Sequence, residues 1–303
     1  MKPKSPFPYF GGKSTISDVV WGRFGNVKTY IEPFFGSGAV LFARPGDCFS
    51  HEIVNDYDGN IANVWRSIQS DPHEVARLCD WPCNHIDLMA RRAVLIAEKE
   101  NLRQSLIDDP EYCNPKLAGY WIWCICNWIG DCMLTESKSK SKECKRPELG
   151  KNKGIMGCDV QALLIAMQCR LRNVKVVCGD WSRVMGGNWQ TNYGICGVFL
   201  DPPYTTTERS DCYDTNSHTV ARDVREWCLQ NGDNQLFRIA LCGYDGEHNE
   251  LEDSGWSAYK WKPNGGMANQ GSLDSRGKKN ISKETIWFSR NCLQDDLFSF
   301  CQE

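Results

Sequence analysis

The strongest signal of the fold class is the segment Thr29-Tyr-Ile-Glu-Pro-Phe-Phe-Gly-Ser-Gly-Ala-Val40. Its first four residues have the character of a short buried strand, and residues 33–38 form a glycine-rich turn. The apolar residues after the turn can open a helix. A strand, a glycine turn and a helix in this order predict an α/β protein, in which ligands bind at the carboxyl ends of parallel strands.

Other short apolar segments are typical of further strands of the same sheet. We predict strands at residues 51–56, 197–200, 237–242 and 284–288. The first of these ends in the acid Asp56, the second stops at Asp201, and the third is closed by Gly243. Strands alternating with helical stretches predict a doubly wound, Rossmann-like sheet with helices on both faces.

The middle of the chain has a different pattern. Residues 74–78, 88–106 and 117–129 have helical spacing, a Ser/Lys/Gly-rich loop follows, and no segment there resembles a strand of the sheet. A chain of 303 residues suits one catalytic core with a sizeable insertion. We therefore expect a core formed by residues 1–66 and 160–303, and a mainly helical inserted domain at 67–159.

Composition and charge exclude several classes of protein. Hydrophobic residues make up 41% and charged residues 24%, as in ordinary globular proteins. The amino terminus has no apolar segment typical of a secretory signal, and the apolar run at 120–130 is about half the ~20 residues that a membrane span needs. We expect a soluble protein of the cytoplasm, with no membrane partner.

The net charge of −3 hides an uneven distribution. Residues 138–153 contain seven Lys or Arg and two Glu, a local charge of 7 − 2 = +5, and a second basic stretch lies at 276–283. Basic patches on a nearly neutral protein suit contact with nucleic acid phosphates. A solvated loop explains the same charges equally well.

Seventeen cysteines need an explanation in a chain without an export signal. The closest clusters, Cys79-x3-Cys83-x-His85 and Cys124-x-Cys126-x5-Cys132, lack the paired C-x2-C spacing of a structural zinc site. Cysteines in apolar stretches are expected to be buried thiols, namely Cys169, Cys178, Cys196, Cys228 and Cys242. We expect no metal.

The tetrapeptide Asp201-Pro-Pro-Tyr204 is the most informative motif. Two consecutive prolines fix φ and remove two N–H donors, so the carbonyls around them are held as acceptors. A carboxylate, rigid carbonyls and an aromatic face at the end of a strand could grip a planar ring that carries an amine. A rigid turn that only ends the strand is the alternative.

Two acids at other strand ends suit a nucleoside cofactor. Asp56 could accept hydrogen bonds from ribose hydroxyls, while the glycines of the turn at 33–38 let a cofactor approach the backbone. The turn has neither the G-x-G-x-x-G spacing of dinucleotide binders nor that of a phosphate loop. Asp180 follows another strand-like segment and could equally be a helix N-cap.

In this order, the motifs resemble the Dam-type (alpha group) DNA adenine-N6 methyltransferases, and in particular a phage- or prophage-like member. The resemblance rests on residues 9–13 (Tyr-Phe-Gly-Gly-Lys), 30–40, 55–56, 179–180 and 201–204, with support from 213–219. It fades between residues 67 and 160. There a helix at 117–130 takes the place of a DNA-contacting helix but ends in Trp128-Ile-Gly-Asp-Cys132 instead of the family's usual Asn-Gly-x-x-Arg-like ending.

The resemblance implies the chemistry and its residues. It implies methyl transfer from S-adenosylmethionine to the exocyclic amine of a flipped-out adenine in double-stranded DNA, by a monomer or weak dimer. The implied catalytic residues are Asp201, Pro202, Pro203 and Tyr204. The implied cofactor-binding residues are Tyr9, Lys13, Glu32, Pro33, Phe34, Gly36, Ser37, Gly38, Asp56, Asp180 and Asp201. The candidate DNA contacts are Lys138, Lys140, Lys142, Lys145, Arg146, Asn216, Ser217, Arg276, Lys278 and Lys279.

Three alternatives stay open at this stage. Cytosine N4 presents the same chemical problem as adenine N6, and the shape of the pocket decides between them. An RNA or protein methyltransferase would have a similar cofactor site. A catalytically inactive nucleic-acid-binding protein could share the fold, although Lys13, Asp56, Asp201 and Tyr204 all keep their chemical groups. The target sequence, and an orphan or restriction-modification role with a partner endonuclease, are left undecided.

Overall fold

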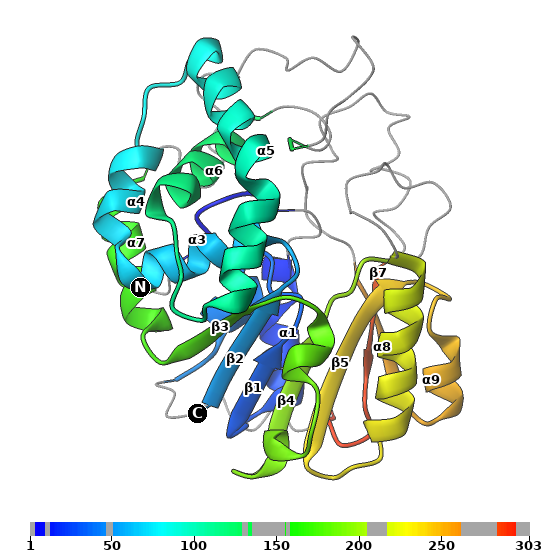
Figure 1. Cartoon of the computed structure of the whole chain (residues 1–303). Coiled ribbons are helices and arrows are strands. Elements are labelled where there is room, and N and C mark those ends of the chain that lie inside the picture. Colours follow the sequence, from blue (N-terminus) through cyan, green and yellow to red (C-terminus); the bar gives the residue numbers. More distant parts are fainter. Residues whose placement is uncertain are drawn as a thin grey trace. The chain divides into compact units, whose positions relative to one another are not determined.

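The structure is a computed structural model that describes residues 4–9, 13–46, 51–128, 133–134, 155, 158–204, 217–261 and 284–294 (Figure 1). The chain divides into two compact units. The first contains the described residues of Met1–Pro8 and Asn55–Trp181. The second contains those of Tyr9–Val54, Ser182–Thr207 and Tyr213–Glu303.

Seven strands form one sheet in the order β3-β2-β1-β4-β5-β7-β6. β1 is parallel to β2 and β4, β4 is parallel to β5, and β7 is antiparallel to both β5 and β6. This confirms the predicted Rossmann-like α/β sheet. The strands are β1 (Thr29–Glu32), β2 (His51–Asp56), β3 (Val174–Cys178), β4 (Cys196–Leu200), β5 (Phe237–Tyr244), β6 (Ser257–Trp261) and β7 (Glu284–Phe288).

The pairing of β1 with β4 positions the motifs. Every residue of β1 and of β4 is buried, as expected for central parallel strands that are covered on both faces. The two strands run in register, with Ile31 opposite Val198. In the sheet, β2 lies next to β1 on the side away from β4, and β5 lies next to β4 on the side away from β1. The order of the strands thus reverses between β1 and β4. The turn after β1 and the tetrapeptide after β4 therefore start side by side, at a switch point where α/β sheets bind ligands.

Helices cover both faces of the strands in the second unit. Figure 1 draws α1 behind the strands and α8 in front of them, where α8 packs against β5. α2 is short and follows the glycine turn directly. The helical segments are η1 (Lys13–Thr15), α1 (Ser17–Phe24), α2 (Ala39–Ala43), η4 (Trp189–Thr191), α8 (Ser217–Asn231) and α9 (Asn249–Asp253), and η3 (Trp181–Val184) lies at the boundary of the two units.

The first unit is mainly helical. It contains α3 (Gly59–Ser70), α4 (Pro72–Cys79), α5 (His85–Asp108), α6 (Pro115–Asn127) and α7 (Val160–Leu171). Each of these helices begins after an Asp or Asn whose side chain accepts a backbone N–H of the first turn, which satisfies a donor that the helix leaves free. The capping residues are Asp58, Asp71, Asn84, Asn114 and Asp159.

The three helices predicted between residues 74 and 129 are confirmed as α4, α5 and α6, and no strand occurs among the described residues of 67–159. The compact unit also includes residues 55–66 and 160–181, so it is larger than the predicted insertion. That residues 67–159 recognise a target stays a prediction.

Residues 4–8 pack into the helical unit through Phe7. Its side chain is 2% exposed, and its ring lies 5.5 Å from that of Trp65 and 4.8 Å from that of Trp121, edge to face with the latter. The Cys126 thiol donates a hydrogen bond to the Pro6 carbonyl. A short segment thereby joins the core that α3 and α6 share.

The cysteine predictions are confirmed with one exception. Cys178, Cys196, Cys228 and Cys242 are buried, but Cys169 is exposed. The buried face of α7 consists of Val160, Leu164, Met167 and Leu171, spaced four, three and four residues apart, and Cys169 falls outside this stripe. An apolar neighbourhood in the sequence did not reveal which face of the helix the thiol occupies.

Within the described ranges, no three His, Cys, Asp or Glu side chains are grouped so that they could hold a metal ion. None of the helices in these ranges has both the length and the apolar character to cross a bilayer.

Candidate active site

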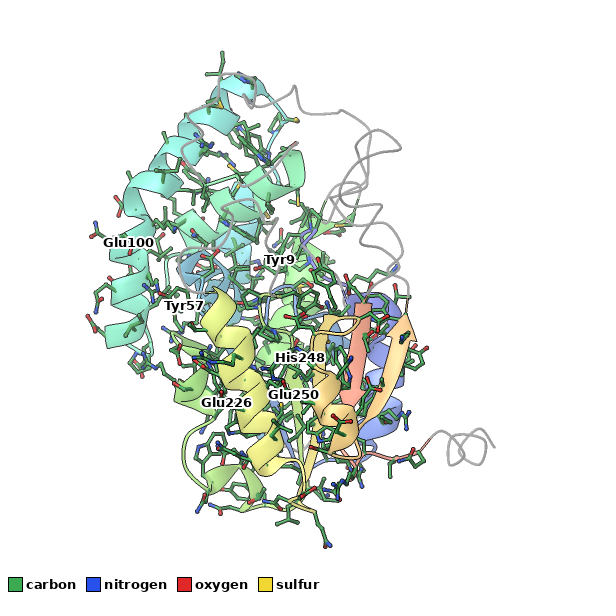
Figure 2. The ribbon with its side chains drawn as sticks, turned by 90° about the vertical axis from the view of Figure 1, so that its right-hand side faces the viewer. Tyr9, Tyr57, Glu100, Glu226, His248 and Glu250 are labelled. Atoms are coloured by element: carbon green, nitrogen blue, oxygen red, sulfur yellow. The ribbon has the colours of Figure 1, made fainter. Side chains whose placement is uncertain are left out.

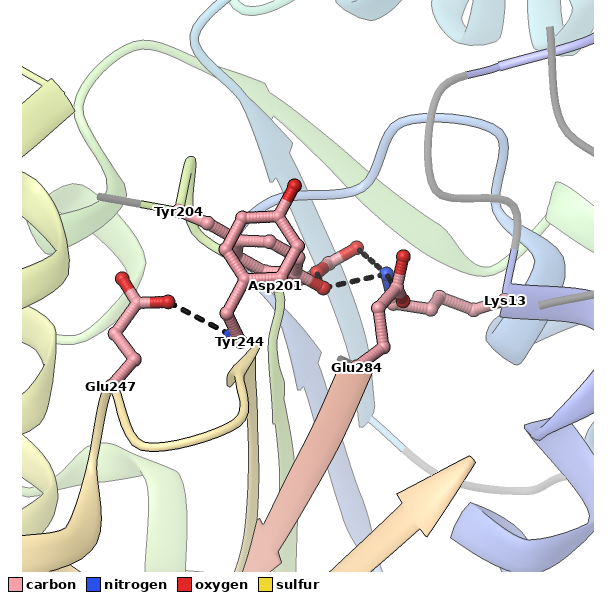
Figure 3. A network of polar contacts seen from close by, with 6 residues as sticks. All are labelled: Lys13, Asp201, Tyr204, Tyr244, Glu247 and Glu284. Atoms are coloured by element: carbon pink, nitrogen blue, oxygen red, sulfur yellow. Dashed lines mark hydrogen bonds and ion pairs between the residues drawn. The ribbon is translucent and has the colours of Figure 1, made fainter. Parts of the chain in front are cut away.

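The tetrapeptide at 201–204 leaves the carboxyl end of β4 and places two polar side chains together (Figure 3). The Tyr204 hydroxyl donates a hydrogen bond of 2.9 Å to Oδ1 of Asp201. The Asp201 side chain keeps 21% of its surface exposed, whereas Pro202 and Tyr204 are buried. The rigid backbone of the two prolines thus fixes a carboxylate at the surface of the sheet edge.

Lys13 reaches this motif from η1, 191 residues away from Tyr204 in the sequence. Its Nζ lies 3.0 Å from Oδ2 of Asp201 and donates a hydrogen bond of 2.9 Å to the Tyr204 hydroxyl. Each oxygen of the Asp201 carboxylate therefore has a donor. The structure thereby brings together a predicted cofactor residue and the predicted catalytic motif.

The charges of the cluster follow from its burial. The Lys13 side chain is only 6% exposed, and this burial opposes its positive charge, but Asp201 and, to a smaller extent, Cys242 and Glu284 outweigh the burial and raise its pKa. Burial and the nearby Asp201 charge raise the pKa of Tyr204 well above its ordinary value. At neutral pH Lys13 is therefore cationic, and Tyr204 is a neutral hydroxyl that donates to Asp201.

Three residues of this site were not among the predicted site residues. Glu284 begins β7, and its Oε2 lies 3.5 Å from Nζ of Lys13. The Tyr244 ring packs edge to face on that of Tyr204 at 4.8 Å, and the Trp261 ring centroid lies 5.8 Å from the Lys13 ammonium. The sequence signal that could have indicated Glu284 is a charged residue at the first position of an otherwise mostly apolar strand.

The glycine turn has left-handed backbone at Gly36 (φ 46°) and Gly38 (φ 68°). A Cβ at Gly36 would lie 2.7 Å from the Tyr9 ring, and one at Gly38 would lie 2.8 Å from the rings of both Phe35 and Phe42. Both glycines are thus needed for the turn itself and for close packing. Tyr9, a predicted cofactor residue, rests directly on the turn.

The other predicted residues of the turn are mostly buried. Glu32 is 3% exposed, and it accepts a hydrogen bond of 2.8 Å from the Tyr30 hydroxyl. Burial and the Glu32 charge raise the pKa of Tyr30 well above its ordinary value. Pro33 and Ser37 are buried, while Phe34 is half-buried. Of these four residues, Phe34 has the side chain that is most accessible to solvent or to a ligand.

Asp56 and Asp180 both belong to the first unit, where the backbone joins their strand ends. The Gly179 N–H donates to the Asp56 carbonyl at 3.1 Å, and the Asn55 side chain donates to the Gly179 carbonyl at 3.0 Å. Oδ1 of Asp56 accepts the N–H of Asp58. Asp56 is half-buried and Asp180 is exposed. Two acids predicted from separate motifs thus lie at neighbouring strand ends.

The candidate DNA contacts lie outside the described residues. This holds for Lys138, Lys140, Lys142, Lys145, Arg146, Asn216, Arg276, Lys278 and Lys279. Ser217 is the first residue of α8, and its side chain is not described. Their role stays a prediction.

The strand order, the antiparallel β7 between β5 and β6, and the polar motifs at the switch point define a Rossmann-like α/β fold with its candidate site at the carboxyl ends of the strands. Residues 9–104 match the family of D12 class N6 adenine-specific DNA methyltransferases. A stretch of 75 residues, 25% of this chain, is 29% identical to the DNA N-6-adenine-methyltransferase of Escherichia phage P1 and spans 10% of that protein's length.

These matches confirm the resemblance predicted from the motifs. The family match includes Tyr9, Lys13, the glycine turn and Asp56, and it ends before Asp180 and Asp201. The tetrapeptide is tied to the matched part through the ion pair between Lys13 and Asp201.

Proposed function

We propose that this chain transfers a methyl group from S-adenosylmethionine to the exocyclic N6 amine of adenine in double-stranded DNA. The observation that carries the proposal is the position of Asp201 and Tyr204 beside Lys13 at the switch point of the sheet. The match of residues 9–104 to adenine-specific DNA methyltransferases supports it.

The residues present suit a nucleoside cofactor with a cationic sulfur. When bound, S-adenosylmethionine would supply an electrophilic methyl group on a sulfonium and leave as a neutral thioether. In the second unit, the cofactor-binding residues of this proposal are Tyr9, Lys13, Glu32, Pro33, Phe34, Gly36, Ser37, Gly38 and Asp201. In the first unit, Asp56 is proposed to accept from ribose hydroxyls and Asp180 from the adenine amine.

Asp201 and the Pro202 carbonyl are proposed to act on the target amine. The lone pair of an aromatic amine is delocalised into the ring, so the amine is a poor nucleophile. Two acceptors that bind its two hydrogens pull the nitrogen towards sp³ geometry and localise the lone pair. Asp201 then stabilises the positive charge that develops on nitrogen and receives the proton that the methylated amine loses. Because a stacked base is inaccessible, the adenine must first be flipped out.

Tyr204 has two parts in this proposal. Its hydroxyl is proposed to orient the Asp201 carboxylate, and the hydrogen bond of 2.9 Å between them supports this role. Its ring is proposed to stack on the flipped base, an interaction worth ~1–3 kcal/mol in comparable sites. The side chain is 6% exposed and packs on Tyr244, so stacking requires it to turn outward. The two parts therefore belong to successive states, because this turn releases the hydrogen bond to Asp201.

The proposed partner is double-stranded DNA in the cytoplasm, at the nucleoid when bound, and the proposed state is a monomer or weak dimer. Cytosine N4 methylation is the second candidate function, because Asp201 and Pro202 would accept the two hydrogens of that amine in the same way.

The test measures methyl transfer from labelled S-adenosylmethionine to DNA, RNA and protein, followed by digestion of the DNA to nucleosides. N6-methyladenine is the expected product, whereas N4-methylcytosine, methylated RNA or methylated protein would contradict the proposal. We expect Asp201→Ala to reduce turnover by more than about a hundredfold, because a preorganised group that stabilises transition-state charge is lost. Glu284 still pairs with Lys13 in this variant, so the fold should be retained.

Asp245→Ala is the matched control, because it removes an exposed carboxylate of the same unit whose partner is the surface residue Lys260. Its turnover should be that of the wild type. An Asp201→Ala protein with wild-type turnover would remove Asp201 from the mechanism.

A further inference from the structure

Glu284 supplies a second carboxylate at the Lys13 ammonium. Its side chain is 12% exposed, and the distance from Oε2 to Nζ is 3.5 Å, compared with 3.0 Å from Nζ to Oδ2 of Asp201. In Figure 3 the Glu284 side chain points from the first residue of β7 towards the Lys13 ammonium. One buried cation thus lies between two carboxylates.

The register of the sheet holds Glu284 in this place. It is opposite Tyr244 of β5 and opposite Trp261 of β6. Directly opposed residues of antiparallel strands point to the same face of a sheet, so the three side chains form one row. Tyr244 contacts Tyr204 and Trp261 faces Lys13. Two aromatic side chains therefore flank the carboxylate on the face where the ion pair lies.

The net charge of the cluster matters for the proposed reaction. Lys13 contributes +1, and Asp201 and Glu284 contribute −1 each, so the cluster carries −1. Without Glu284 the pair of Lys13 and Asp201 would be neutral. Its electrostatic attraction for the positive charge that develops on the amine would then be weak. Interactions between charges are strong in such a weakly exposed site. The second carboxylate thus compensates for the ammonium that is paired with Asp201.

We propose that Glu284 is a positioning residue that shares the charge of Lys13 and so leaves Asp201 free to stabilise the positive charge on the target amine. The proposal rests on the proposed methyl transfer. It is argued from the charges of Lys13, Asp201 and Glu284 and places Glu284 outside direct contact with the reacting atoms.

The first test compares Glu284→Gln with Glu284→Asp. Gln keeps the shape and removes the charge, so we expect kcat to fall ~10- to 100-fold while KM for DNA changes less than about threefold, because the lost interaction acts only in the transition state. Asp keeps the charge and should recover most of kcat. Glu250→Gln is the control, since it removes a 63% exposed carboxylate of the same unit and should leave kcat unchanged.

The second test needs no turnover. Binding of S-adenosylmethionine and of S-adenosylhomocysteine is measured by calorimetry without DNA. The first ligand has one more positive charge, at sulfur, so Glu284→Gln should weaken it more than the second, by on the order of threefold or more. Melting temperatures of all variants verify that they are folded.

The outcomes separate this inference from the proposed function. A wild-type enzyme that modifies no adenine contradicts the function. An active wild type with a Glu284→Gln variant of unchanged kcat overturns the inference. An equal loss of kcat in Glu284→Gln and Glu284→Asp also overturns it, because shape rather than charge would then explain the effect.

Discussion

At the residue scale, burial decides the charge state of His248. The side chain is 1% exposed, and its ring lies 5.1 Å from that of Trp287, edge to face. It precedes α9, as Figure 2 shows next to Glu250. Burial lowers its pKa from 6.5 to about 4; Glu247 opposes this decrease and Arg225 adds to it. The folded protein therefore holds His248 neutral.

The consequence is a dependence of stability on pH. The unfolded chain binds a proton at His248 below pH 6.5, whereas the folded chain resists it down to about pH 4. Above pH 6.5 His248 is neutral in both states and does not affect the free energy of unfolding. As the pH falls from 6.5 towards 4, protonation of the unfolded chain lowers the free energy of unfolding. At pH 5 the loss should be ~2 kcal/mol.

Urea unfolding at pH 8 and pH 5 measures this loss in the wild type and in His248→Gln. Other groups titrate over the same range, so the comparison is the difference between the two proteins. The variant should lose less stability on acidification, because its side chain has no proton to gain. Identical losses in both proteins would show that His248 does not titrate as described.

At the element scale, the turn between β1 and α2 depends on glycine for two separate reasons. Gly36 has φ 46°, and a Cβ there would also lie 2.7 Å from the Tyr9 ring. Gly46 has φ 79° and no atom within 4 Å of its Cβ position. A side chain at Gly46 would therefore meet the same unfavourable backbone conformation as one at Gly36, but no steric clash.

We expect Gly36→Ala to destabilise the protein by more than Gly46→Ala. Left-handed backbone costs a non-glycine residue ~1–3 kcal/mol, and the clash with Tyr9 adds to this cost only at Gly36. Thermal unfolding measures the difference, and calorimetry should show weaker binding of S-adenosylmethionine in Gly36→Ala alone. Equal effects of the two substitutions would mean that the Tyr9 ring moves away from the new methyl group without a loss of stability.

The elements also show what local sequence can and cannot specify. Predicted strands at 51–56 and 284–288 have the observed bounds, because each is a short segment with consecutive apolar or β-branched residues and a polar residue at its start. β6 is absent from the predicted strands. It is short, its burial alternates, and among the described strands it pairs with β7 alone, so its pattern is weak without that partner.

At the scale of the whole molecule, the described chain consists of two compact units, and residues 4–8 belong to the helical one. Phe7 provides the main apolar contact of this segment and is buried against Trp65 and Trp121. The helical core is thus completed by residues that are distant from α3 and α6 in the sequence.

Phe7→Ala should lower the free energy of unfolding by ~3–5 kcal/mol, because a large buried ring leaves a cavity. Leu236→Ala, at a side chain 42% exposed, is the control and should cost well under 1 kcal/mol. Urea denaturation followed by tryptophan fluorescence measures both. A Phe7→Ala protein as stable as the control would show that the segment contributes little to the core.

From the sequence alone, the sheet class and the strands that end in the glycine turn and in the tetrapeptide could be predicted. These features follow from local rules: proline fixes φ, glycine permits left-handed turns, and central parallel strands are rich in apolar residues. For the same reason the tetrapeptide and the glycine turn could be assigned to strand ends.

Only the tertiary structure decided which charges meet. Lys13 and Glu284 are 271 residues apart in the chain, and the tertiary fold brings their charged atoms to 3.5 Å. Likewise, the contact of Tyr9 with Gly36 and the exposed position of Cys169 depend on packing. Local sequence does not predict such contacts, because they form only when distant segments pack around a common core.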